Sequence, residues 1–250
     1  MTTAILFDLD DTLTPDGASF REAALATARG LDVPDELAEA VLRHARAAWR
    51  QGPHWGWFQM IGCSSWEGLW APAGGSGPRV GAIREWLCSV YRPAAWRAGL
   101  EQVGADPGLA GRAAAEFVEH RAGCCTAYPD AVPALERVRA AGLRVAVVTN
   151  GMSDLQWLKL ERAGLTPYAD AFVASSAAGI GKPDARIFEL ALERIGCAAG
   201  AALMVGDNLE RDVAGAQAAG LRAAWIDRAG RDPGDITPDV RIGSLAELEW

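Results

Sequence analysis

The chain has 250 residues, of which 50% are hydrophobic and 22% are charged, and its formal net charge is −8. This composition is typical of a globular protein with a sizeable core and excludes a disordered chain, while the acidic balance argues against a nucleic-acid polymer as partner. No apolar run approaches the ~18 residues of a membrane span, so we expect a cytoplasmic protein that does not bind membranes, either a monomer or a small homo-oligomer.

The first predicted element is a buried strand, Ala4-Ile5-Leu6-Phe7, which ends abruptly in acidic residues. Parallel strands are covered on both faces and become polar only where they leave the sheet. If the extended geometry continues through Leu9, Asp8 and Asp10 face the same small volume. Two carboxylates that close need a shared proton or a cation, so an acid/base pair or a Mg²⁺ site is predicted. The alternative is an acidic loop or a helix cap.

Residues 14–127 show helical periodicity and no convincing strand. Two helices are predicted within residues 20–50, the second starting near Pro34, and further helices near 80–91, 96–103 and 107–121. Residues 52–78 are rich in Gly, Pro, Ser and Trp and are predicted to be loop with short helical pieces. We therefore expect a mainly helical insertion, 14–127, within an α/β domain formed by 1–13 and 128–250.

Seven of the ten tryptophans and all three histidines lie in the insertion. Tryptophans at helical spacing usually belong to a core, as expected here for Trp49, Trp86 and Trp96. Those in irregular sequence are candidates for a substrate wall that stacks on a planar group: Trp55, Trp57, Trp66 and Trp70. The histidines lack the spacing of metal ligands and are interpreted as packing or surface residues.

From Tyr128 onward, strands alternate with helices of about ten residues. Helices are predicted at 130–141, 153–163, 183–195 and 211–219. Strands are predicted at 143–149, 171–174, 201–205 and 222–226, followed by a surface loop at 227–238 and a last short strand and helix. This alternation indicates right-handed crossovers and a Rossmann-like parallel sheet flanked by helices. The five cysteines lack CxxC spacing and are interpreted as reduced thiols.

Polar residues follow several of these strands. The second strand ends in Thr149-Asn150-Gly151, the third leads to a loop containing Lys182, and the fourth ends in Gly206-Asp207-Asn208, with Asp212 close behind. Lys182 is one of only two lysines. Ligands of open parallel sheets bind beyond the carboxyl ends of the strands, so these side chains are expected to share one site.

Phosphoryl transfer is the chemistry that uses such a set. The Thr149 hydroxyl, main-chain amides near Asn150 and the Lys182 ammonium are suited to phosphate oxygens. Mg²⁺ prefers oxygen ligands, which Asp8 and Asp207 can provide.

The two N-terminal aspartates then take different roles. An ionised Asp8 can attack phosphorus and form an acyl-phosphate that water hydrolyses. Asp10 would give a proton to the leaving alkoxide and later take one from water.

The motifs DLDDT (8–12), TNG (149–151), GKP (181–183) and GDxxxxD (206–212) resemble, in order, the four signatures of the haloacid dehalogenase superfamily. This resemblance implies that Asp8 is the nucleophile, that Asp10 is the acid/base and lends its main-chain carbonyl to the metal, and that Asp212 binds the metal or orients the site. The insertion resembles the family's helical cap. The stretch from Thr149 to Leu165 and the following GKPDARIFELALERIG are similar to a branch with nucleotide 5′-phosphatases and acylneuraminate 9-phosphatases.

The sequence thus predicts a Mg²⁺-dependent phosphatase that hydrolyses a small phosphorylated metabolite. The first candidate for the substrate is a nucleotide or another phosphate ester with a planar group. The alternatives are a sugar-phosphate phosphatase or phosphomutase, a hydrolytic dehalogenase, and an inactive binding protein. Three residues keep simpler structural interpretations: Thr12 as a turn residue, Asn150 as a turn residue, and Asp212 as the cap of a helix at 213–219.

Overall fold

The computed structural model describes residues 1–72, 74 and 78–250 and divides the chain into two compact units. The first unit comprises Met1–Pro15 and Thr126–Trp250, and the second comprises Asp16–Cys125. Each observed boundary lies two residues from the predicted one, at 13/14 and 127/128. Residues 73 and 75–77, which belong to the predicted loop at 52–78, lie outside the described residues.

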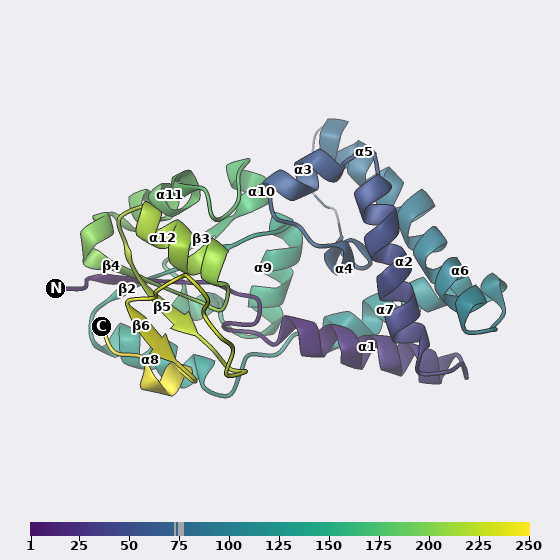
Figure 1. Cartoon of the computed structure of the whole chain (residues 1–250), viewed down its shortest axis with the longest axis horizontal. Helices are drawn as coiled ribbons and strands as arrows, with labels where there is room; N and C mark the ends of the chain where they lie inside the picture. The colour runs from purple at the N-terminus through teal and green to yellow at the C-terminus, as the bar shows by residue number, and fades with distance from the viewer. Residues whose placement is uncertain (73, 75–77) are drawn as a thin grey trace. The chain divides into compact units, whose positions relative to one another are not determined.

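The first unit is built on one parallel sheet (Figure 1). Its strands are β1 (Ala4–Phe7), β2 (Arg144–Thr149), β3 (Ala171–Ala174), β4 (Ala202–Gly206), β5 (Arg222–Ile226) and β6 (Val240–Ile242). They run in the order β3-β2-β1-β4-β5-β6, and every neighbouring pair is parallel. The predicted Rossmann-like sheet is therefore confirmed. The chain proceeds outward from β1 in both directions, which makes the carboxyl end of β1 the point where ligands bind in such sheets.

Helices cover both faces of this sheet because successive side chains of each strand point to opposite sides. The helices are α8 (Ala131–Ala140), α9 (Ser153–Arg162), α10 (Ser175–Ala178), α11 (Ala185–Ile195) and α12 (Gly215–Ala218). Ile5 and Phe7 of β1 join a buried cluster with α8, whereas Ala4 and Leu6 join one with α11 and α12. All four side chains are fully buried, so β1 is held firmly between two hydrophobic layers.

Two helix starts differ from the sequence-based expectation. The helix predicted at 183–195 begins at Ala185, because the Asp184 side chain accepts a hydrogen bond from the main-chain N–H of Arg186 and caps it. The helix predicted at 211–219 is instead a π-helix, Leu209–Ala214, followed directly by α12. Its cap is Asn208, whose side chain accepts from the Arg211 N–H. The interpretation of Asp212 as a helix cap is therefore wrong.

The second unit is helical. Its α-helices are α1 (Asp16–Gly30), α2 (Leu37–Gln51), α3 (Trp55–Met60), α4 (Ser65–Gly68), α5 (Pro78–Trp86), α6 (Arg92–Gln102) and α7 (Ala110–Gly123). A π-helical turn, Leu87–Tyr91, joins α5 directly to α6, so the helices predicted near 80–91 and 96–103 form one continuous run. Here α2 packs against α6, and α1 packs against α7. The described part of this unit contains no strand, and none of the helices among the described residues is long and apolar enough to cross a membrane.

Tryptophans build much of the core of this unit. Trp49 stacks on Phe58 with ring centroids 3.9 Å apart, and Trp96 is fully buried. Trp70 is only 2% exposed and lies under the guanidinium of Arg121, so it belongs to the core rather than to a surface. The other candidates for a substrate wall keep part of their rings exposed: Trp55, Trp57 and Trp66.

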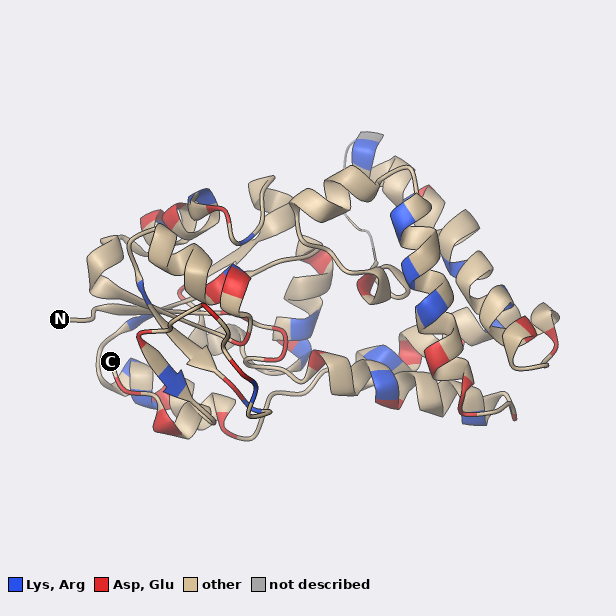
Figure 2. Ribbon diagram, in the orientation of Figure 1, with Lys and Arg blue, Asp and Glu red and all other residues tan. Residues whose placement is uncertain are grey.

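The exposed side of the second unit carries a row of basic residues. Arg43, Arg46 and Arg50 recur along α2 at helical spacing and are exposed (Figure 2). The buried face of the same helix includes Val41 and Trp49. The helix is therefore amphipathic, as its sequence periodicity predicts. All five cysteines are free thiols, in agreement with the sequence-based interpretation.

One partly buried carboxylate, Asp130, connects residues 244 and 245 with the start of α8. Arg228 donates to both oxygens of Asp130 at 3.0 Å, and the Ser244 hydroxyl and the Leu245 N–H donate to Oδ2 at 2.7 and 2.9 Å. Arg228 also donates to the main-chain oxygen of Thr12 at 3.0 Å. Burial alone disfavours the carboxylate, but these hydrogen bonds outweigh that effect and lower the pKa of Asp130. Through Arg228, these hydrogen bonds also hold the loop that follows β1 in place.

We expect Asp130→Asn to lower the free energy of unfolding by about 2 kcal/mol at neutral pH, because hydrogen bonds to a charged group are lost. The pKa of Asp130 is lower in the folded chain than in the unfolded chain, where it is roughly 3.9, so the ionised side chain stabilises the fold above pH 3.9. This stabilisation is lost as the pH falls through the pKa of the folded chain. The difference between wild type and variant should therefore shrink in acid. Urea unfolding from pH 7 to pH 3 measures it, with Asp235→Asn on the exposed loop as control. An equal loss at every pH would contradict this account.

Candidate active site

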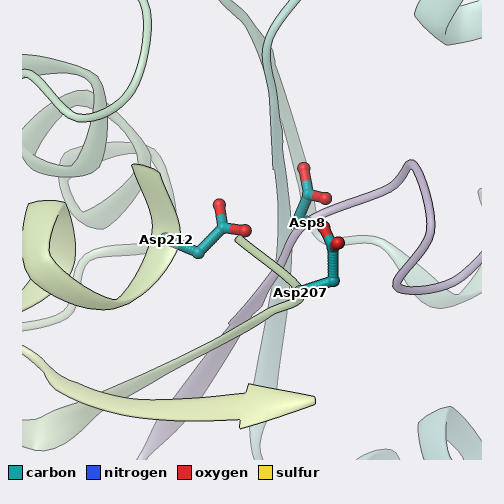
Figure 3. Close-up of side chains that lie close together, drawn as sticks. All are labelled: Asp8, Asp207 and Asp212. Atoms are coloured by element: carbon teal, nitrogen blue, oxygen red, sulfur yellow. The ribbon is translucent and has the colours of Figure 1, made fainter. Parts of the chain in front are cut away.

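Three carboxylates converge beyond the carboxyl ends of β1 and β4 (Figure 3). Asp8 directly follows β1, Asp207 directly follows β4, and Asp212 lies on the π-helix after it. One oxygen from each can be chosen so that all lie within 4.8 Å of one another. Asp8 and Asp212 are buried, whereas the Asp207 side chain is 24% exposed. The cluster therefore opens toward solvent on the side of Asp207.

Burial and neighbouring carboxylates raise the pKa of two of these groups, Asp8 and Asp207. Burial, opposed by Lys182 and reinforced by Asp212, raises the pKa of Asp8 to about 6. Burial, with added repulsion from Asp8, Asp212 and Asp11, raises the pKa of Asp207 to about 7. A cluster of oxygen donors in which Asp8 and Asp207 resist ionisation fits a hard divalent cation, which would relieve their repulsion.

Lys182 supplies the positive charge within this cluster. Its Nζ lies 2.6 Å from Asp8 Oδ1 and 2.6 Å from Asp212 Oδ1, and its side chain is 2% exposed. Burial by itself disfavours the ammonium, but the neighbouring Asp212 and Asp8 outweigh it and raise the pKa of Lys182. The lysine therefore stays charged at neutral pH beside the proposed nucleophile.

The approach of Asp212 depends on a glycine. A Cβ at Gly206, the last residue of β4, would lie 2.3 Å from the carboxyl carbon of Asp212. The second oxygen of Asp212 accepts from the Asn208 N–H at 3.0 Å. One oxygen of Asp212 thus pairs with Lys182, and the other accepts a hydrogen bond from the loop after β4. Asp212 therefore holds both the lysine and this loop in place. The main chain of that loop is held in turn, because Trp225 and Arg231 both donate to the Asp207 carbonyl oxygen at 2.9 Å.

The loop after β2 is hydrogen-bonded to the loop that carries Lys182. The Asn150 side chain donates to the Lys182 carbonyl oxygen at 2.9 Å and accepts from the Lys182 N–H at 2.8 Å. This pairing leaves the main chain of Asn150, rather than its side-chain amide, as the group to consider for phosphate. Thr149 is buried beside it, and the Thr12 hydroxyl lies 3.4 Å from Asp8 Oδ2. Thr12 therefore contacts Asp8 as well as forming the turn.

Asp10 has partners that the sequence interpretation did not include. Lys159 Nζ lies 2.9 Å from both carboxylate oxygens of Asp10, and Gln156 Nε2 donates to Oδ2 at 3.0 Å. Both partners come from α9 and lie three positions apart, so they share one face of that helix. The scarcity of lysine was a usable signal, because Lys159 is the only lysine besides Lys182.

The strand ends therefore bring together most of the residues predicted from the sequence. Asp8, Asp207, Asp212 and Lys182 form one cluster, and Asn150 anchors its lysine. Asp10 is directed to α9 instead of to the carboxylate cluster. The predicted tryptophan wall belongs to the other unit.

A sequence profile described as a haloacid dehalogenase-like hydrolase matches residues 2–220. Phosphoserine phosphatase from Thermus thermophilus is 39% identical over 246 residues, which is 98% of this chain and 96% of that protein. The pyrimidine 5′-nucleotidase YjjG from Escherichia coli is 38% identical over 151 residues, 60% of this chain and 65% of its own.

Solved structures share the arrangement of the chain. The crystal structure of the hydrolase YfnB from Bacillus subtilis covers 98% of this chain and 96% of its own, with a TM-score of 0.67 and 21% identity. At that identity the likeness concerns the fold. The sequence relatives, not this structure, connect the chain with phosphate esters.

Proposed function

This chain is a phosphatase of the haloacid dehalogenase-like hydrolase family, and from that premise we propose that it hydrolyses small phosphate monoesters through a phosphorylated Asp8. The observation that carries the proposal is Lys182, which is buried between Asp8 and Asp212 at 2.6 Å from each. A charged lysine there keeps one carboxylate available as a nucleophile and attracts a phosphate dianion to it.

In the first half of the proposed reaction, an Asp8 oxygen forms a bond to phosphorus while the bond between phosphorus and the leaving oxygen breaks. Asp10 gives its proton to that oxygen, and an alcohol departs. In the second half, Asp10 takes a proton from water as the water oxygen attacks phosphorus. The bond from Asp8 to phosphorus breaks, which releases inorganic phosphate and restores both aspartates. Thr149, the main chain near Asn150 and Lys182 would hold the phosphate oxygens throughout.

Mg²⁺ fits the donor set of this site. The carboxylates of Asp8 and Asp207, with the Asp10 carbonyl as implied by the family, would hold it, while Asp212 stays engaged with Lys182 and Asn208. When bound, the ion would neutralise charge on the phosphate and on the two carboxylates. The raised pKa values of Asp8 and Asp207 support this assignment, since a cation would lower both.

Two substrate classes are supported by different observations. A nucleotide, or another phosphate with a planar group, is our first candidate because Trp55, Trp57 and Trp66 expose part of their rings. O-phosphoserine is the second, because the phosphoserine phosphatase similarity extends over 98% of the chain and so includes the helical unit, whereas the nucleotidase similarity extends over 60%.

One experiment tests this proposal. The purified chain is assayed for phosphate release from p-nitrophenyl phosphate, O-phosphoserine, nucleoside monophosphates and sugar phosphates, and for halide release from 2-haloacids. We expect phosphate release that EDTA abolishes and excess Mg²⁺ restores, with one substrate class preferred in kcat/KM. Halide release that EDTA does not affect would instead indicate a dehalogenase, and isomerised sugar phosphate a phosphomutase. Absence of all turnover would contradict the proposal.

A further inference from the structure

The only two lysines of the chain each bind one of the two aspartates in Asp8-Leu9-Asp10. Lys182 forms an ion pair with Asp8, as described above. We propose that Lys159, assisted by Gln156, is a positioning residue that fixes the direction of the Asp10 carboxylate for both proton transfers. This inference rests on the proposed function and adds to it residues outside the four sequence motifs.

The burial of Lys159 is the first argument. Its side chain is 2% exposed, whereas the Asp10 side chain is 24% exposed. Removing an ammonium from water is strongly unfavourable unless a well-placed anion compensates, so a buried lysine needs a specific partner. Here Nζ is 2.9 Å from both Asp10 oxygens, a two-point contact that restricts rotation of the carboxylate. The carboxylate is thus anchored from the protein side while part of it remains accessible.

Gln156 supplies the second argument because it connects Asp10 with the phosphate loop. Its Nε2 lies 3.0 Å from Asp10 Oδ2 and 2.8 Å from the Asn150 carbonyl oxygen. Asn150 in turn pairs with the main chain of Lys182, whose ammonium contacts Asp8. A continuous polar path therefore joins the acid/base to the nucleophile through the buried residues Gln156, Asn150 and Lys182, which suits a fixed geometry between them.

The consequence concerns the leaving group. A proton donor matters most when the departing oxygen is strongly basic, and little when it leaves readily as an anion. Misplacing the donor by about 1 Å can cost on the order of 10²-fold in rate. Loss of Lys159 should therefore slow esters of poorly acidic alcohols more than esters of acidic ones. A lysine needed only for folding would not produce this selectivity.

The test compares phenyl phosphate with p-nitrophenyl phosphate, which have the same ring but leaving groups of different acidity. For Lys159→Met, we expect kcat/KM for phenyl phosphate to fall by about tenfold to a hundredfold, and for p-nitrophenyl phosphate by no more than about threefold. Since kcat/KM reports steps up to loss of the alcohol, it isolates the first proton transfer. Arg162→Met removes an exposed positive charge from the same helix and should leave both values unchanged.

A double-mutant cycle adds an independent readout. If Lys159 acts through Asp10, then Lys159→Met should change the phenyl phosphate rate of an Asp10→Asn enzyme by less than about twofold, because the effects of coupled residues do not add. Equal losses of kcat/KM on both esters would refute the positioning role of Lys159 and leave the proposed function standing. The same holds if the effects of Lys159→Met and Asp10→Asn on the phenyl phosphate rate are fully additive. A wild-type chain that hydrolyses neither ester would refute the proposed function and this inference with it. The p-nitrophenyl phosphate activity shows directly that the variant is folded.

Discussion

Asp8→Asn will lower kcat for phosphate ester hydrolysis by about 10⁴-fold or more, because an amide cannot form the proposed phosphoryl-enzyme. Asp8 is 7% exposed and contacts Lys182, so the substitution removes the proposed nucleophile while keeping the shape of the side chain. The fold should survive, since Lys182 retains Asp212 at 2.6 Å as its partner. Steady-state kinetics measure the loss. Acid quenching of wild type during turnover, followed by intact mass, should show one added phosphoryl group that the variant lacks.

Asp11→Asn provides the matched control for this experiment. It makes the same chemical change three positions along, in a residue with φ of 56°, a conformation that Asn tolerates well. We expect its kcat to stay within about threefold of wild type. Hydrolysis that persists in Asp8→Asn, or that is lost equally in Asp11→Asn, would remove Asp8 from the role of nucleophile.

Lys182→Met will cost both activity and stability. It leaves Asp8 and Asp212 buried without their ammonium partner, and breaking a buried ion pair in this way typically costs about 3 kcal/mol or more. We expect kcat to fall by about 10³-fold, since the substrate phosphate and the proposed nucleophile Asp8 both lose the Lys182 ammonium. Urea unfolding and kinetics, both at pH 7.5, measure the two effects.

The loss of stability should depend on pH, and the sign is fixed by Asp8. The pKa of Asp8 is about 6 in the intact site, and removal of Lys182 can only raise it further. Protonation at lower pH therefore relieves the unpaired charge, so the destabilisation should be largest above pH 7 and should shrink below pH 6. Arg211→Met, an exposed neighbour of Asp212, should be neutral at every pH. A destabilisation that grows in acid would contradict this account.

Local sequence patterns were sufficient to predict the parallel sheet. Ala4–Phe7 is a run of apolar residues between polar ones, and the later strands are separated by helices that end at glycine, such as Gly196, which has a φ of 59°. Because parallel strands end at one edge, the strand-end rule also brought Asp8, Asp207 and Lys182 together. These inferences need only the order of elements along the chain.

The direction of Asp10 could not be derived in the same way. The strand ends at Phe7, before both aspartates, and the chain turns at Asp11, where φ is 56°. Asp8 and Asp10 consequently have different partners, Lys182 on one loop and Lys159 on α9. Side-chain direction after a turn depends on tertiary contacts that lie 149 residues away in sequence.

The tryptophan-rich segment shows a second limit. Trp55 and Trp70 lie in equally irregular sequence, yet Trp55 is half-buried and Trp70 is 2% exposed against Arg121. Composition identified the segment but could not separate core residues from surface residues, because the packing of short helices such as α4 is set by contacts with other helices rather than by their own periodicity.

The pairing of both lysines with aspartates also determines how the protein can be labelled. Each lysine side chain is 2% exposed, so the ε-amino groups of Lys159 and Lys182 are shielded from amine-reactive reagents in the folded chain. Amine-reactive dyes should therefore modify these two side chains much more slowly in the folded chain than in the unfolded chain. Slow acylation of the two lysines would report directly on opening of the site.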